Sequence, residues 1–169
     1  MSVAEATSRW VPLLGRTQPD TLPLFCLPHA GAGASAFRTW PDCLPGVLVL
    51  PVQPPGRESR FREAPYERMG PLVAELAAIM LGVAGSRPYA VYGHSLGALV
   101  AFETLREIRR RGGTEPVHLF VSGCVALMNR PSRDVLAEVF PGVPLTREIG
   151  EFGTPPPKPM SPHKRNVRW

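Results

Sequence analysis

Short apolar runs separated by longer amphipathic stretches dominate the first 123 residues of the chain. Four of these runs predict strands, over residues 22–28, 46–52, 88–93 and 117–123. Each is apolar almost continuously rather than at every second position, which is typical of strands buried on both faces. The pattern therefore predicts a mostly parallel sheet that is covered by helices on both sides.

Helical periodicity appears between these predicted strands. Residues 69–85 carry apolar side chains at positions 72, 73, 76, 79, 80 and 83, a spacing that predicts a helix with one buried stripe. Residues 96–113 predict a second helix, which has arginines in its last turn and a Gly-Gly stop. Residues 35–44 predict a short helix interrupted by Pro41. Strands that alternate with helices indicate the α/β class.

The pattern also suggests boundaries. Residues 1–21 show no clear period and are expected to form an extended leader, followed by a partial α/β domain over 22–152. Beyond Cys124 one short helix is predicted, over 132–140, and the basic, proline-rich tail 153–169 is expected to be disordered. Because 117–123 is the last clear strand, we expect it to form an unpaired edge of the sheet.

Composition restricts the classes of protein that fit. Hydrophobic residues make up 44% and charged residues 20%, as in ordinary soluble domains, and no apolar run or signal segment indicates a membrane partner. Three separated cysteines without a CxxC pair argue against a disulfide framework or a zinc site. The net charge of +5 comes mostly from the tail, so no nucleic-acid partner is expected. These features predict a cytoplasmic protein.

The segment GHSLG, residues 93–97, matches the G-x-S-x-G pattern of a nucleophile elbow. The flanking segments support this interpretation, because a predicted strand precedes the motif and a predicted helix follows it. At such a turn the flanking positions must be glycine, since side chains there would collide with neighbouring backbone. We therefore predict that Ser95 is a catalytic nucleophile, and that the helix beginning at Leu96 directs its first amides at the reaction centre.

A second small-residue segment, PHAGAG at residues 28–33, directly follows the first predicted strand. Small residues allow the backbone to approach a substrate closely. In hydrolases that carry an elbow, the loop at this place supplies another amide of the oxyanion hole. The alternative is a simple turn between a strand and a helix.

Four blocks in order, LFCLPHAGAGASAFRTW, LVLPVQPPGRESRFRE, YAVYGHSLGALVAFE and HLFVSG, resemble the type II thioesterases of polyketide and nonribosomal peptide assembly lines. The resemblance implies an α/β-hydrolase fold and hydrolysis of stalled or aberrant acyl groups. The implied partner is an acyl or peptidyl carrier protein with a phosphopantetheine arm, and no metal or bound cofactor is implied. By position, Ser95 is the nucleophile, and the backbone amides of Ala30 and Leu96 form the oxyanion hole.

The chain also departs from that family. The family's catalytic Asp and His lie well beyond the serine, in blocks that nothing here resembles. This predicts a C-terminally truncated member that lacks the lid and the last strands, and the change in composition near Gly153 suggests a frameshift or a premature truncation as the cause. Weak or absent activity is therefore expected. Asp134 and His163 reproduce the order Ser…Asp…His, but order alone is weak evidence.

The remaining histidines receive other roles. His29 and His94 are expected to line the pocket, and His118 is expected to be structural. Two further functions stay open at this point. The first is a non-catalytic fragment that binds a carrier protein or an acyl group. The second is another serine esterase or acyltransferase of the same fold.

Overall fold

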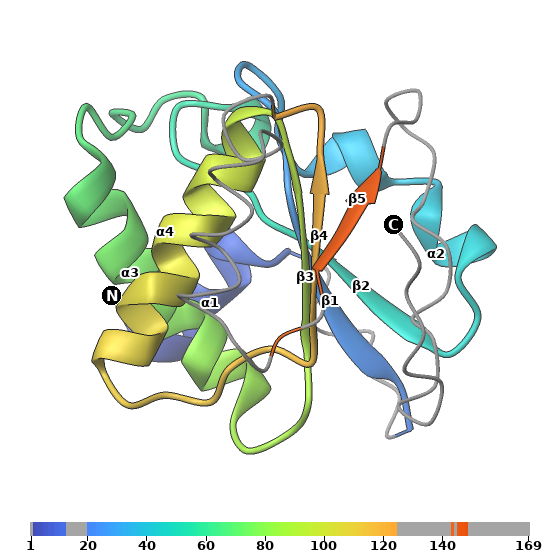
Figure 1. Cartoon of the computed structure of the whole chain (residues 1–169). Coiled ribbons are helices and arrows are strands. Elements are labelled where there is room, and N and C mark those ends of the chain that lie inside the picture. Colours follow the sequence, from blue (N-terminus) through green and yellow to red (C-terminus); the bar gives the residue numbers. More distant parts are fainter. Residues whose placement is uncertain (1, 13–19, 125–142, 144, 149–169) are drawn as a thin grey trace.

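Five parallel strands form one sheet in the order β2-β1-β3-β4-β5 (Figure 1). The computed structural model describes residues 2–12, 20–124, 143 and 145–148. The strands are β1 (Leu22–Leu27), β2 (Val47–Pro51), β3 (Ala90–His94), β4 (His118–Ser122) and β5 (Leu145–Glu148). The four strands predicted from apolar runs are confirmed, as is the parallel sheet.

Helices cover both faces of this sheet, as predicted. Figure 1 shows α1 (Val3–Trp10), α3 (Met69–Ala84) and α4 (Leu96–Arg110) on one face. The short helices η2 (Ala34–Phe37) and α2 (Trp40–Cys43) lie on the other face, and η3 (Glu58–Arg60) lies in the connection from β2 to α3. Pro41 falls in the first turn of α2. Proline suits that position, so it begins a second short helix and does not interrupt one helix over 35–44.

Successive side chains along a strand point to opposite faces of the sheet, and the core is therefore divided into two clusters. In β1, Phe25 and Leu27 pack with the residues of α3 and α4, whereas Leu24 and Cys26 pack against Phe37 and Trp40. The helical stripe predicted in α3 is confirmed by its buried residues Val73, Leu76, Ile79, Met80 and Val83. Packing on both faces explains why the strands are apolar at consecutive positions.

The prediction of an extended leader over residues 1–21 is wrong for Val3–Trp10, which form the helix α1. Ser2 caps this helix, because its hydroxyl accepts the Glu5 amide at 3.2 Å. Ala6 and Trp10, one turn apart, pack against the core, and Trp10 is only 1% exposed. The helix is too short for its period to stand out in the sequence, and packing of Trp10 stabilises it.

The strand over 117–123 is not an unpaired edge. In the structure β5 pairs with β4 from Leu119 opposite Leu145 to Ser122 opposite Glu148. The sequence LTRE of β5 lacks the apolar run on which strand prediction depends, and polar residues are common on edge strands. The helix predicted over 132–140 and the tail 153–169 lie outside the described residues.

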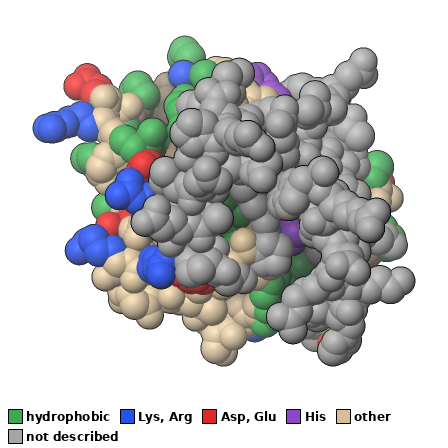
Figure 2. All heavy atoms as spheres, in the orientation of Figure 1, with side chains coloured by type: hydrophobic (Ala, Val, Ile, Leu, Met, Phe, Trp, Pro, Cys, Tyr) green, Lys and Arg blue, Asp and Glu red, His purple; other side chains and the backbone are tan. Residues whose placement is uncertain are grey.

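Arginines near the C-terminal end of α4 are paired with acids, most of them on the same helix, whereas Arg109 contacts Glu115 beyond it at 3.4 Å. Glu107 contacts Arg110 at 2.7 Å and Arg111 at 2.8 Å, and Glu103 contacts Arg106 at 3.0 Å. Figure 2 shows basic and acidic side chains interspersed on this side of the molecule. The described helices contain none that is both long and apolar enough to cross a membrane.

Candidate active site

Ser95 occupies the sharp turn between β3 and α4. Its backbone has φ 52° and ψ −116°, and among the described residues only Ser95 and Glu58 combine a positive φ with a side chain. The Ser95 amide donates a hydrogen bond to the Ser122 carbonyl at 2.8 Å, so the end of β4 holds the turn. Strained backbone of this kind persists only where its surroundings fix it, and it is concentrated at functional sites.

Two glycines allow the turn to pack against its neighbours. A Cβ atom on Gly93 would lie 2.5 Å from the Ala98 Cα atom, and one on Gly97 would lie 2.2 Å from the Leu27 carbonyl oxygen. Real Cβ atoms do not approach backbone this closely, so both positions require glycine. The predicted reason for the G-x-S-x-G glycines is thereby confirmed.

The loop after β1 lies against the first turn of α4. The Ala32 amide donates to the His29 carbonyl at 3.1 Å, and Gly31 has φ 85°, the positive value that type II turns require at this position. Ala30 and Leu96 line one common pocket. Leu96 is the first residue of α4, so its amide has no acceptor within the helix and lies at the positive end of the helix dipole.

Gln53 ties this loop to the segment after β2. Its side chain is 1% exposed, and its Oε1 atom accepts the Ala34 amide at 3.0 Å. Its Nε2 atom donates to the carbonyl oxygens of Pro54 at 3.2 Å and Arg57 at 2.9 Å. One buried amide side chain thus satisfies backbone groups of two loops and fixes their separation.

Glu58 provides a second tie between the same two loops. Its carboxylate accepts the Ser35 hydroxyl at 2.6 Å and the Ser35 amide at 3.2 Å, at the start of η2. Glu58 has φ 44°, and a Cβ atom on Gly33 would lie 2.6 Å from its Cδ atom. Sequence reasoning assigned no role to Gln53 or Glu58. The block QPPGRESR carried the resemblance but gave no sign that its polar side chains hold the PHAGAG loop.

The two histidines near the turn differ in position. His29 lines the pocket, whereas His94 is not among the lining residues, and its Nδ1 atom lies 3.2 Å from the Ser122 hydroxyl. The two rings meet edge to face with centroids 5.8 Å apart. Burial, and then the neighbouring His29, lower the pKa of His94, which favours its neutral form. Asp134 and His163 lie outside the described residues.

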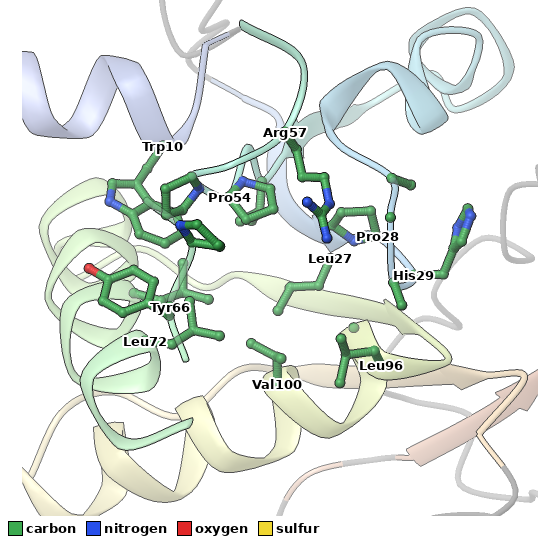
Figure 3. A pocket seen from close by; sticks show the side chains of 18 residues that line it. Trp10, Leu27, Pro28, His29, Pro54, Arg57, Tyr66, Leu72, Leu96 and Val100 are labelled. Atoms are coloured by element: carbon green, nitrogen blue, oxygen red, sulfur yellow. The ribbon is translucent and has the colours of Figure 1, made fainter. Parts of the chain in front are cut away.

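The pocket itself is a cavity of about 170 Å³ with mostly apolar walls. Figure 3 shows Leu96 and His29 at one end, Trp10 and Tyr66 at the other, and Leu27 between them. Ser95 directly precedes Leu96, so the nucleophile predicted from sequence adjoins the end of the pocket that Leu96 lines. Within the described ranges, no cluster of three or more His, Cys, Asp or Glu side chains could hold a metal ion.

The parallel sheet, the strained serine between strand and helix, and the adjoining glycine-rich loop are the features of the α/β-hydrolase fold. A thioesterase domain model matches residues 22–137, and the chain belongs to this family of thioesterases. The resemblance to type II thioesterases is confirmed by the relatives described next.

The gramicidin S biosynthesis protein GrsT of Aneurinibacillus migulanus is 40% identical over 124 residues, which cover 73% of this chain and 48% of GrsT. The solved structure of the RedJ thioesterase from the prodiginine pathway of Streptomyces coelicolor is 47% identical, with a TM-score of 0.57 over 60% of this chain and 38% of RedJ. The type II thioesterase BorB of the borrelidin cluster is 31% identical, with a TM-score of 0.61 over 76% of this chain and 56% of BorB. The chain spans about half the length of the curated relatives that it matches.

Substituting Gly97→Ala is expected to destabilise the protein by about 3 kcal/mol, because the new Cβ atom collides with the backbone carbonyls of Leu27 and Pro28. The matched control is Gly82→Ala on α3, where nothing lies within 4 Å of the added atom. That change should stabilise the protein by about 0.5–1 kcal/mol. Urea unfolding measures both. Equal effects of the two substitutions would refute the close approach at Gly97.

Substituting Gln53→Met is expected to lower the free energy of unfolding by about 1–3 kcal/mol, because it removes the buried Gln53 amide and leaves the partly buried Ala34 N–H without its acceptor. Thr104→Val is the control. The Thr104 hydroxyl is buried and has no hydrogen-bond partner in the described part of the chain, so its removal should be neutral or stabilising. Chemical denaturation followed by circular dichroism measures both variants. A neutral Gln53→Met would show that the two loops do not depend on this side chain.

Proposed function

We propose that the chain carries the nucleophile and oxyanion hole of a serine thioesterase that removes stalled or aberrant acyl groups from phosphopantetheinyl carrier proteins. The observation that carries the proposal is the strained Ser95 at the N-terminus of α4, beside a pocket that Ala30 and Leu96 both line. The membership in the thioesterase family supports the choice of a thioester over an oxygen ester.

The geometry supports a two-step mechanism. The Ser95 Oγ atom attacks the thioester carbonyl carbon, and the carbonyl oxygen gains negative charge as the tetrahedral intermediate forms. The Ala30 and Leu96 amides donate hydrogen bonds to that oxygen, and the positive end of α4 adds to their effect. The carbon–sulfur bond then breaks, the phosphopantetheine thiol leaves with a proton, and water hydrolyses the acyl-serine to release a carboxylic acid.

Each step also requires a base that accepts a proton and returns it. Of the histidines in the described part of the chain, His29 and His94 precede Ser95 and His118 lies on β4, whereas the family's base follows the serine in a later block, so none of them matches its position. We therefore expect weak turnover from this chain. An oxyanion hole and binding can retain part of the rate enhancement when a triad is incomplete.

The carrier protein is the proposed partner because the acyl group reaches the enzyme on its arm. A relative named for gramicidin S biosynthesis and a solved type II thioesterase support this choice of substrate. No cofactor is proposed, since the attacking oxygen and the stabilising amides all come from the chain.

The hydrolysis of acyl carrier protein tests this proposal. Purified protein is expected to release acid far more slowly than the ~1–10³ s⁻¹ of ordinary enzymes, and Ser95→Ala should abolish the release above background. Ser8→Ala is the matched control, since Ser8 lies on the exposed part of α1 and should not affect the rate.

Release that is unchanged by Ser95→Ala would contradict the assigned nucleophile. Rapid turnover that depends on Ser95 would contradict the expected weakness and would show that a base is present. Carrier binding without any release that depends on Ser95 would favour the non-catalytic alternative.

A further inference from the structure

The cavity extends from the predicted reaction centre to an end that is formed by two aromatic rings. Figure 3 shows Leu27 and Val100 between the Leu96 end and the group formed by Trp10 and Tyr66. The lining between the two ends is mostly apolar, although Arg57 also lines the cavity, so a group that enters beside Leu96 meets mainly hydrocarbon before it reaches the rings. This is the environment that an alkyl chain prefers.

Trp10 is held in place by three different contacts. Its Nε1–H donates to a Glu75 carboxylate oxygen at 2.6 Å, and the Arg60 guanidinium lies 4.8 Å from the centre of its ring. Its backbone carbonyl accepts the Gln53 amide at 2.8 Å. These contacts join α1 to α3 and to the segment after β2, so the indole cannot leave the cavity wall without breaking several interactions.

Tyr66 completes this wall. Its ring stacks on Trp10 with centroids 6.3 Å apart, and its hydroxyl donates to the other carboxylate oxygen of Glu75. Burial and the neighbouring Glu75 raise the pKa of Tyr66 to about 12, so the hydroxyl remains a donor at physiological pH. One carboxylate therefore anchors both rings, which we call the Trp10–Tyr66 wall.

The volume of the cavity indicates the size of the group that fits. It measures about 170 Å³, close to the ~150 Å³ apolar cavity that admits benzene in another protein. An alkyl chain of roughly six carbons matches this volume.

We propose that the cavity is the acyl-chain site of the enzyme, and that the Trp10–Tyr66 wall sets the upper limit of acyl length. The inference rests on the proposed function for its substrate class, an acyl thioester, and adds a specificity that no motif in the sequence indicates. Short unbranched acyl groups fill the cavity, and longer chains meet the two rings.

The test uses a ladder of S-(2-oxoalkyl) pantetheine thioethers with alkyl chains of increasing length. These probes resemble the acyl arm but cannot be hydrolysed, so binding is measured without turnover. Isothermal titration should show affinity rising roughly fourfold per methylene and then levelling off near roughly six carbons. The same pattern is expected in Ser95→Ala, because the wall lies at the opposite end of the cavity.

Two substitutions move the expected limit in opposite directions. In Trp10→Ala, affinity should level off at a chain that is longer by roughly two carbons or more, because one ring of the wall has been removed. Leu72→Phe should shorten it by roughly one or two carbons, because Leu72 lines the cavity on α3 and is only half-buried. The second variant keeps the test decisive if Trp10→Ala fails to fold.

Leu81→Phe is the matched control, since Leu81 is also half-buried on α3 but does not line the cavity. It should leave the limit unchanged. Affinity that is independent of chain length, or a limit that Leu72→Phe leaves in place, would overturn the inference. A correct length limit without hydrolysis that depends on Ser95 would refute the proposed function and leave the acyl site standing.

Discussion

The close approach of α4 to the end of β1 determines the rest of the site. Only a glycine at position 97 lets the first turn of the helix lie against the carbonyl oxygens of Leu27 and Pro28. That contact places the Leu96 amide beside the loop that carries Ala30, and both residues then line one cavity. The strain at Ser95 is a consequence, because a chain that leaves β3 and enters a helix so near β1 must turn abruptly.

The segment between β2 and α3 stabilises both ends of the cavity. Near its start, Gln53 and Glu58 hold the loop that contains Ala30 through hydrogen bonds to Ala34 and Ser35. At its far end, Tyr66 forms part of the aromatic wall with Trp10. A connection without long regular structure therefore links the amides proposed for catalysis to the residues proposed to limit the acyl group. The backbone of Glu58 has a strained positive φ, and the two hydrogen bonds that its carboxylate accepts from Ser35 help to offset the cost of that strain.

The sequence predicted those parts of the fold that depend on local patterns. The strands and α3 were found because consecutive or periodic apolar residues mark them, and Ser95 because its flanking glycines have a steric cause. It could not reveal α1, whose stability depends on the burial of Trp10, or β5, whose polar sequence carries no strand pattern. The role of Gln53 was equally hidden, since its hydrogen bonds join segments that are distant in sequence.

The reactivity of Ser95 toward a fluorophosphonate tests the central claim most directly, because phosphonylation depends on the serine, its activation and the oxyanion hole but on no acyl pocket or carrier protein. Intact mass and peptide mapping should show slow labelling at a single site, Ser95, and none in Ser95→Ala. Labelling spread over several serines, or confined to a different one, would contradict the account, because it would show that the turn between β3 and α4 confers no special reactivity.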